Sequence, residues 1–204
     1  MRFAICCFFL LILSLGLARP VSAGDDKPYT VEDGDALMEG EAALVIYAGY
    51  PASGVRYLAA PWDYVNLGLQ FEVEYSPTLA LGVPFKGQLI QTRDEAFNFA
   101  LTFLPSVEFS FGQYAVTAPM KPGFALGWRF YPGISWFTTG AYDLNVPVSQ
   151  EATFSHYPEA AMGIEFPVSK MINLSVKGLV KFVDYRPEAF VYGGAAGISF
   201  ALWR

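Results

Sequence analysis

The chain has little cysteine, little histidine and few charged residues. Its two cysteines, Cys6 and Cys7, both stand within the first 23 residues, and His156 is the single histidine. The rest of the chain therefore has no thiol for a disulfide or a cysteine metal site. A zinc site of the common kind needs several Cys or His ligands, so no metal is expected. No glycine-rich phosphate loop follows a strand and opens a helix, and no cofactor is expected.

Charged residues make up 16% of the sequence, whereas globular proteins average about 25%. Hydrophobic residues reach 53% and aromatic residues 17%. The 13 Lys and Arg against 19 Asp and Glu give a net charge of −6, and binding of nucleic acid is excluded because it needs a basic surface. Beyond residue 23 no apolar run approaches the length of a transmembrane helix. The apolar side chains must therefore be accommodated in another way.

The N-terminal residues predict export. Arg2 is followed by the apolar stretch Phe3–Leu17, and the small residues Val21-Ser22-Ala23 offer a cleavage site. This order is typical of a secretory signal peptide, so residues 1–23 are expected to be removed. Residues 24–40 are acidic and contain Pro and Gly, and they are predicted to form a flexible periplasmic N-terminal segment. Residues 41–204 then form one domain.

That domain shows the period-two pattern of β-strands. Between residues 64 and 75, for example, Val65 and Phe71 stand at odd positions, and Asn66 and Gln70 at even positions. One face is apolar and aromatic, and the other is small, polar or charged. Turn residues separate ten predicted strands, at about 41–48, 54–60, 62–75, 79–91, 96–111, 123–131, 134–145, 157–167, 171–184 and 189–203. If Glu41–Ala48 forms a helix and neighbouring strands merge, the number is eight.

Two all-β architectures fit this alternation. A soluble barrel points its apolar face inward, whereas a closed antiparallel up-and-down transmembrane β-barrel points it outward to lipid. The second is favoured because the polar face is rich in Gly, Ala, Ser and Asn, as a narrow lumen requires. Aromatic residues also stand near predicted strand ends, where they would meet the membrane interfaces: Trp62, Tyr64, Tyr75, Tyr131, Trp136, Tyr142, Tyr185, Tyr192 and Trp203.

The leader, the run Gly54–Tyr57, the glycine-containing alternating strands and the C-terminal strand resemble the small outer-membrane β-barrel proteins of Gram-negative bacteria. The resemblance implies a location in the cell outer membrane, contact with its lipid, insertion by the barrel-assembly machinery and a monomeric, porin-like form. The chain departs from the family at one point. Such barrels usually end in an aromatic residue, whereas this sequence ends Leu202-Trp203-Arg204.

The charged residues of the polar face predict a network inside the barrel. Opposite charges in a narrow lumen should pair, so the network is expected to fill the lumen, with a selectivity filter as the alternative. Its predicted members are Glu72, Glu74, Lys86, Glu108, Arg129, Asp143, Glu165, Lys177 and Lys181.

Four roles follow from these features. We expect a non-enzymatic barrel with a structural or surface-interaction role and no catalytic residues. A narrow pore or transporter for small or apolar solutes is the alternative. A lipid-modifying enzyme would have to be centred on Ser155, His156 and Glu159, whose proximity in sequence provides no catalytic geometry. A soluble periplasmic lipid-binding barrel is the fourth.

Overall fold

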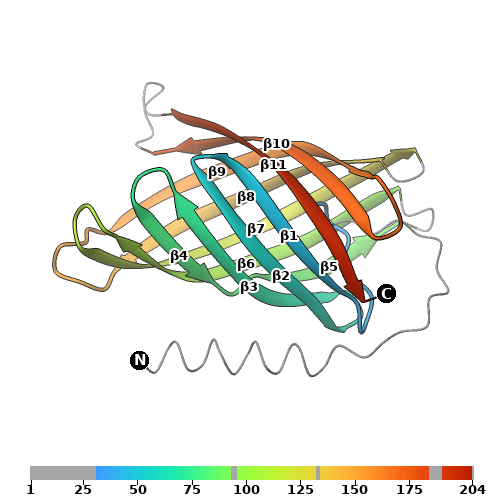
Figure 1. Ribbon diagram of the computed structural model, residues 1–204, viewed down its shortest axis with the longest axis horizontal. Coiled ribbons are helices and arrows are strands. Elements are labelled where there is room, and N and C mark those ends of the chain that lie inside the picture. Colours follow the sequence, from blue (N-terminus) through green and yellow to red (C-terminus); the bar gives the residue numbers. More distant parts are fainter. Residues whose placement is uncertain (1–30, 93–95, 132–133, 184–189, 204) are drawn as a thin grey trace.

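A computed structural model describes residues 31–92, 96–131, 134–183 and 190–203, and within them the fold is all-β (Figure 1). The predicted signal peptide lies outside these residues. The strands are β1 (Ala42–Tyr50), β2 (Ala52–Trp62), β3 (Val65–Glu74), β4 (Thr78–Gly82), β5 (Phe85–Gln91), β6 (Phe97–Ser110), β7 (Ala115–Tyr131), β8 (Ile134–Pro147), β9 (Ser155–Pro167), β10 (Ile172–Phe182) and β11 (Phe190–Trp203). The described residues include no helix that is long and apolar enough to cross a membrane.

The strands form a closed antiparallel barrel with ten positions in its ring. Apart from β4 and β5, strands that follow one another in the sequence pair with each other, and β1 pairs with β11 from Ala42↔Trp203 to Tyr50↔Gly194, which closes the ring. Because Ala42 pairs with Trp203, the start of β1 and the end of β11 lie at the same end of the barrel. We call this the terminal end, and the other the far end. The predicted all-β barrel of ten strands is confirmed.

The strand predicted at 79–91 is interrupted. Its two parts, β4 and β5, lie end to end in one position of the ring, because both pair with β3 on one side and with β6 on the other. The interruption falls at Val83 and Pro84, and proline has no N–H to donate to the ladder. The sequence pattern did not show this break because the alternation continues across it.

A second difference lies at residues 112–122, where the prolines and glycines predicted a loop. Strand β7 already begins at Ala115 and runs through Pro119 and Pro122. Its register with β6 omits Ser106 and Val107, and its register with β8 omits Lys121 and Pro122. The prolines therefore interrupt the hydrogen-bond ladder locally and do not end the strand. As a result, Lys121 stands on the wall of the barrel.

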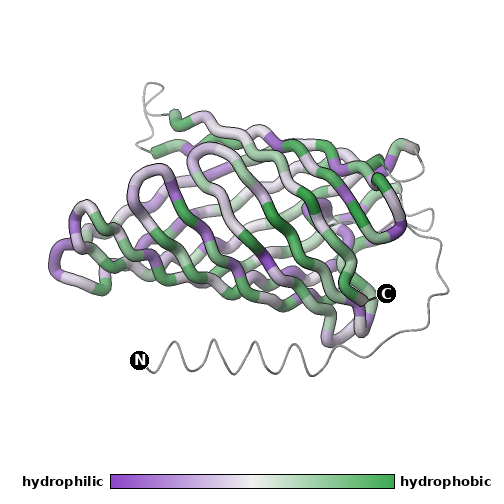
Figure 2. The backbone as a smooth tube through the Cα atoms, in the orientation of Figure 1, coloured by the Kyte–Doolittle hydropathy of each residue, from purple (hydrophilic) through white to green (hydrophobic). Residues whose placement is uncertain are grey.

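Hydrophilic and hydrophobic residues alternate along the strands (Figure 2), and burial alternates with them as the predicted faces require. On β3, Asn66 and Gln70 are buried, whereas Phe71 and Val73 are exposed. On β6, Asn98 and Ala100 are buried and Leu101 and Phe103 are exposed. Small and polar residues therefore face the lumen, and apolar residues face outward.

Candidate functional site

The lumen is occupied at the terminal end by the chain's own N-terminal segment. Residues 31–37, which we call the inserted segment, are all buried. Of the segment predicted at 24–40 to be flexible and periplasmic, residues 31–37 lie inside the barrel, whereas residues 24–30 lie outside the described part of the chain. The composition of the segment is that of a disordered leader, and its burial depends on partners that the barrel provides.

The barrel wall binds the backbone of the inserted segment. The Nζ atom of Lys86 donates hydrogen bonds to the carbonyl oxygens of Val31, Asp33 and Asp35, at 2.8, 2.9 and 2.6 Å. The carboxylate of Glu165 accepts hydrogen bonds from the backbone N–H groups of Val31 and Glu32, at 2.8 and 3.1 Å. These contacts satisfy polar backbone groups that would otherwise be costly to bury.

Two further amides continue the attachment toward the terminal end. The side-chain oxygens of Gln88 and Asn66 accept hydrogen bonds from the backbone N–H groups of Ala36 and Leu37, at 2.9 and 3.1 Å. A small apolar core also holds the segment: Val31 and Leu37 pack with lumen-facing residues of β1, β2 and β11. The members of this core on the wall are Ala43, Val45, Tyr47, Leu58, Ala60 and Ala201.

The three carboxylates of the segment each meet a polar group of the wall. Glu32 lies 3.1 Å from Lys177 Nζ and 3.5 Å from Arg56 Nη1. Asp33 accepts a hydrogen bond of 2.8 Å from the hydroxyl of Ser135. Asp35 forms an ion pair of 3.3 Å with Arg129. Polar side chains from seven wall strands thus hold one short peptide, and β1 and β11 add the apolar contacts.

The electrostatic environment favours the charged form of Glu32. Burial alone would raise the pKa of its carboxyl group, but the nearby cations Lys177 and Arg56 outweigh burial and lower the pKa to about 2. Glu32 belongs to the inserted segment and not to a strand. Its negative charge is therefore an integral part of how the segment is held.

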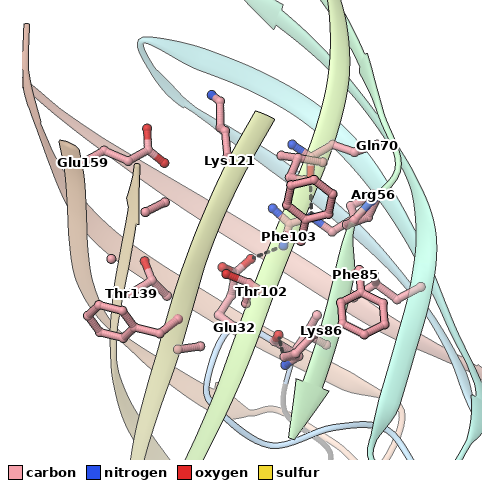
Figure 3. A pocket seen from close by; sticks show the side chains of 18 of the residues that line it. Glu32, Arg56, Gln70, Phe85, Lys86, Thr102, Phe103, Lys121, Thr139 and Glu159 are labelled. Atoms are coloured by element: carbon pink, nitrogen blue, oxygen red, sulfur yellow. Dashed lines mark hydrogen bonds and ion pairs between the residues drawn. The ribbon is translucent and has the colours of Figure 1, made fainter. Parts of the chain in front are cut away.

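Beyond the inserted segment the lumen contains other ion pairs and two cavities of about 180 and 150 Å³, and Val31 and Glu32 of the segment border the larger one. Lys121 lies 3.0 Å from Asp143, and Lys181 lies 4.0 Å from Glu74 and 3.9 Å from Glu159. Figure 3 shows the larger cavity, with Lys86 toward one end and Lys121 and Glu159 toward the other. The open volume of the lumen therefore extends from the inserted segment toward the far end.

The nine residues of the predicted network face the lumen but fall into two groups. Lys86, Arg129, Glu165 and Lys177 contact the inserted segment. The other five stand in the far half: Glu74, Asp143 and Lys181 in the ion pairs above, Glu72 as acceptor from the Tyr47 hydroxyl, and Glu108 close to Lys121 and Glu74.

The charge network predicted from the sequence lacks several charged residues of the lumen. Arg56 and Glu159 stand at lumen positions of their strands, and their register could have revealed them. Lys121 was missed because its stretch was interpreted as a loop. The acidic residues of the inserted segment, Glu32, Asp33 and Asp35, carry no signal of burial in the sequence.

His156 lies at the outer rim of the far end. Its ring stacks against Tyr142, and its Nδ1 atom is 2.6 Å from the Tyr142 hydroxyl. Glu159 lines the lumen cavity and pairs with Lys181, whereas His156 is exposed at the start of β9. The barrel wall thus lies between His156 and the carboxylate that could have oriented it. Among the described residues, no cluster of three His, Cys, Asp or Glu side chains could hold a metal ion.

Comparison with known proteins gives a structural likeness only. No family model matches the chain, and no curated protein matches it. A solved structure described as "De novo design of transmembrane beta-barrels" is similar, with 11% sequence identity, a TM-score of 0.39, and coverage of 82% of this chain and 99% of that chain. A likeness at this level assigns no function, and membership of a Gram-negative outer-membrane family stays a prediction.

Proposed function

We propose that the chain is an integral outer-membrane β-barrel whose lumen is closed at the terminal end by its own N-terminal segment. The observation that carries this proposal is the apolar outer surface. Large apolar side chains are exposed around the ring, including Ile46, Val55, Phe71, Leu81, Phe85, Leu101, Phe124, Ile134, Met162, Val176 and Leu202. Soluble monomers rarely expose a contiguous apolar patch of more than a few hundred Å².

The interior supports the same arrangement. A soluble lipid-binding barrel would place its apolar side chains around a central ligand, but here the buried wall residues include Asn66, Asn98, Asp143 and Glu165. A polar interior and an apolar exterior are typical of transmembrane barrels. Both faces are therefore matched to a bilayer outside and to polar contents inside.

Strand length and aromatic positions also suit a membrane. A tilted strand needs about 9–11 residues to span the hydrocarbon core, and β1, β6 and β10 have 9, 14 and 11 residues. Of the aromatic residues predicted to mark the interfaces, Trp62, Tyr64, Tyr75 and Tyr192 are exposed. Trp136 and Tyr142 are partly exposed. Tyr185 lies outside the described residues, as do the side chains of Tyr131 and Trp203.

The biochemical role that fits best is structural or surface-interacting, without catalysis. The inserted segment occupies the terminal half of the lumen, which favours this role over an open pore. A narrow pore or transporter is the second candidate, supported by the cavities of the far half, and it would require the segment to move. Location in the outer membrane depends on the predicted leader, and assembly as a monomer stays an expectation.

The first test is gel mobility of the outer-membrane fraction with and without boiling in detergent. A closed barrel has no free edge strand and should resist the detergent until heated, so two bands are expected. A single band together with protein in the soluble periplasm would contradict a membrane barrel. Single-channel recording in a planar bilayer then separates the two candidate roles, because a closed lumen predicts no steady conductance.

A further inference from the structure

We propose that the terminal half of the lumen is a binding site for acidic peptides, and that the inserted segment fills this site in cis. The proposal deepens the proposed function, because it rests on the segment that closes the lumen and adds the class of ligand that the wall recognises. Three properties of the contacts indicate which peptides the wall binds: their charge, their use of the peptide backbone and their steric fit.

The charges of the wall and of the segment are matched. The charged wall residues bonded to the inserted segment are the cations Arg56, Lys86, Arg129 and Lys177 and the carboxylate of Glu165. The wall thus has a surplus of three positive charges, and the segment has three carboxylates. Without an acidic occupant, Glu165 alone among these contact groups would offset the four cations, and burying the remaining positive charge is costly. The wall therefore requires an anionic ligand.

The wall recognises a peptide and not merely an anion. Lys86 contacts the carbonyl oxygens of every second residue, and Glu165 accepts two consecutive N–H groups. On the side of the peptide, these five contacts use backbone atoms only. Any peptide in the same conformation can therefore make them. A simple anion such as phosphate offers no N–H groups for Glu165.

Steric fit requires a glycine at position 34 of the inserted segment. A Cβ atom on Gly34 would lie 2.6 Å from the backbone oxygen of Asn98 and 2.9 Å from that of Ala125. On the facing wall, a Cβ atom on Gly127 would lie 2.7 Å from the Cβ of Asp33. Peptide and wall therefore approach each other through two glycines. The ligand pattern is two acidic residues, a glycine and a further acidic residue.

The cis segment has the advantage of its covalent connection. It joins β1 through a tight turn in which Gly40 has a φ of 85° and donates a hydrogen bond of 2.9 Å to Ala60. Such a short connection gives an effective concentration on the order of millimolar. A free peptide must compete with the segment, so the wild-type chain should bind it weakly. The site opens at the terminal end, where an acidic segment of a periplasmic partner would enter.

The test weakens the segment in the full-length chain and offers a peptide in its place. The double variant Glu32→Lys and Asp35→Lys should be repelled by the wall cations. The matched control, Glu39→Lys and Glu151→Lys, makes the same change of charge at two exposed positions. The probe is a synthetic peptide of residues 30–38, labelled at its C-terminus, and binding to detergent-solubilised barrel is measured by fluorescence anisotropy.

We expect the Glu32/Asp35 variant to bind the peptide at least about tenfold more tightly than the wild type or the control variant. Peptides with amides in place of the three carboxylates, or with valine in place of the glycine, should bind at least about tenfold more weakly than the original. Equal binding by variant and wild type would overturn the proposal. Equal binding of the altered peptides would overturn the recognition of acid and glycine.

Two further variants keep the test decisive. If the Glu32/Asp35 variant fails to show the heat-dependent gel shift, Glu32→Gln with Asp35→Asn takes its place, because it removes charge without adding repulsion. The exchange Asp35→Lys with Arg129→Glu should retain the segment and bind peptide no better than the wild type. If the exchange variant binds the peptide as tightly as the Glu32/Asp35 variant does, pairing between Asp35 and Arg129 is refuted. Absence of a heat-dependent shift in the wild type would instead contradict the membrane barrel itself.

Discussion

Lys86 is expected to control how firmly the inserted segment is held, and Lys86→Met tests this directly. The substitution preserves most of the side-chain volume and removes the Nζ atom that contacts three carbonyl oxygens at 2.6 to 2.9 Å. It also removes a cation that lies among the carboxylates of Asp33, Asp35 and Glu165. Both losses weaken the closed state.

The magnitude follows from the three contacts. A hydrogen bond to a charged group contributes about 1.5–3 kcal/mol, and removing one partner of a buried charge cluster costs about 3–5 kcal/mol. The three bonds share one donor and are not additive, and the substitution also removes the desolvation cost of the buried ammonium. We therefore expect the free energy that holds the segment in the lumen to fall by about 3 kcal/mol, or roughly a hundredfold in the opening equilibrium.

The assay measures access to a cysteine on the segment. Ala36→Cys places a thiol at a position that is 9% exposed. Once the leader that contains Cys6 and Cys7 has been removed, this thiol is the single reactive one. Maleimide labelling of the folded barrel should be roughly a hundredfold faster with Lys86→Met in this background. Lys170→Met, at an exposed position of the β9–β10 turn, is the control.

A labelling rate within about threefold of the parent would refute the reasoning, because it corresponds to less than about 1 kcal/mol. An equal acceleration in Lys170→Met would point to a general loosening of the barrel. The heat-dependent gel shift of each variant shows whether the barrel itself has remained folded.

Three other predictions concern pH, the lipid-facing surface and packing in the lumen. Because the pKa of Glu32 is lowered from 4.5 to about 2, its contribution, on the order of 3 kcal/mol, is complete above pH 4.5 and is lost as the pH falls through 2. Labelling at Ala36→Cys should thus be constant from pH 7 to about 5 and rise progressively below about 4.5 once corrected for reagent reactivity; a rise already between pH 6 and 5 would contradict the pairing of Glu32. Val176→Arg, on the outward face near the middle of β10, should lower stability in bilayers by about 2–4 kcal/mol, whereas Val168→Arg in the turn should cost less than about 1 kcal/mol; equal costs in urea unfolding would argue against lipid contact at Val176. Gly163→Ala would place a Cβ atom 2.3 Å from the backbone oxygen of Val176 and 2.6 Å from Phe137 Cζ, and should lower the free energy of unfolding by about 1–3 kcal/mol; an unchanged unfolding midpoint would contradict tight packing of β9 against β10 at this position.

The comparison of sequence and structure turns on what is local and what is not. The alternation on β3 and β6 predicts strands because successive side chains point to opposite faces, and this period of two is a property of the chain itself. It also shows which face is polar, so the lumen positions of Lys86, Glu165 and Lys177 could be named in advance. Proline was the main source of error, since Pro119 and Pro122 interrupt a ladder without ending a strand.

The sequence by itself determined the strands, their two faces and an even number of positions in the ring. Only the tertiary structure decided that the acidic residues 32–35 are buried. In isolation this stretch has the composition of a flexible leader, because it has too few apolar side chains to compensate the entropy of ordering it. The compensating cations and backbone partners come from six strands that are distant in the sequence and are brought together by the closed ring. Closure of the barrel therefore creates the site that the N-terminal segment then fills.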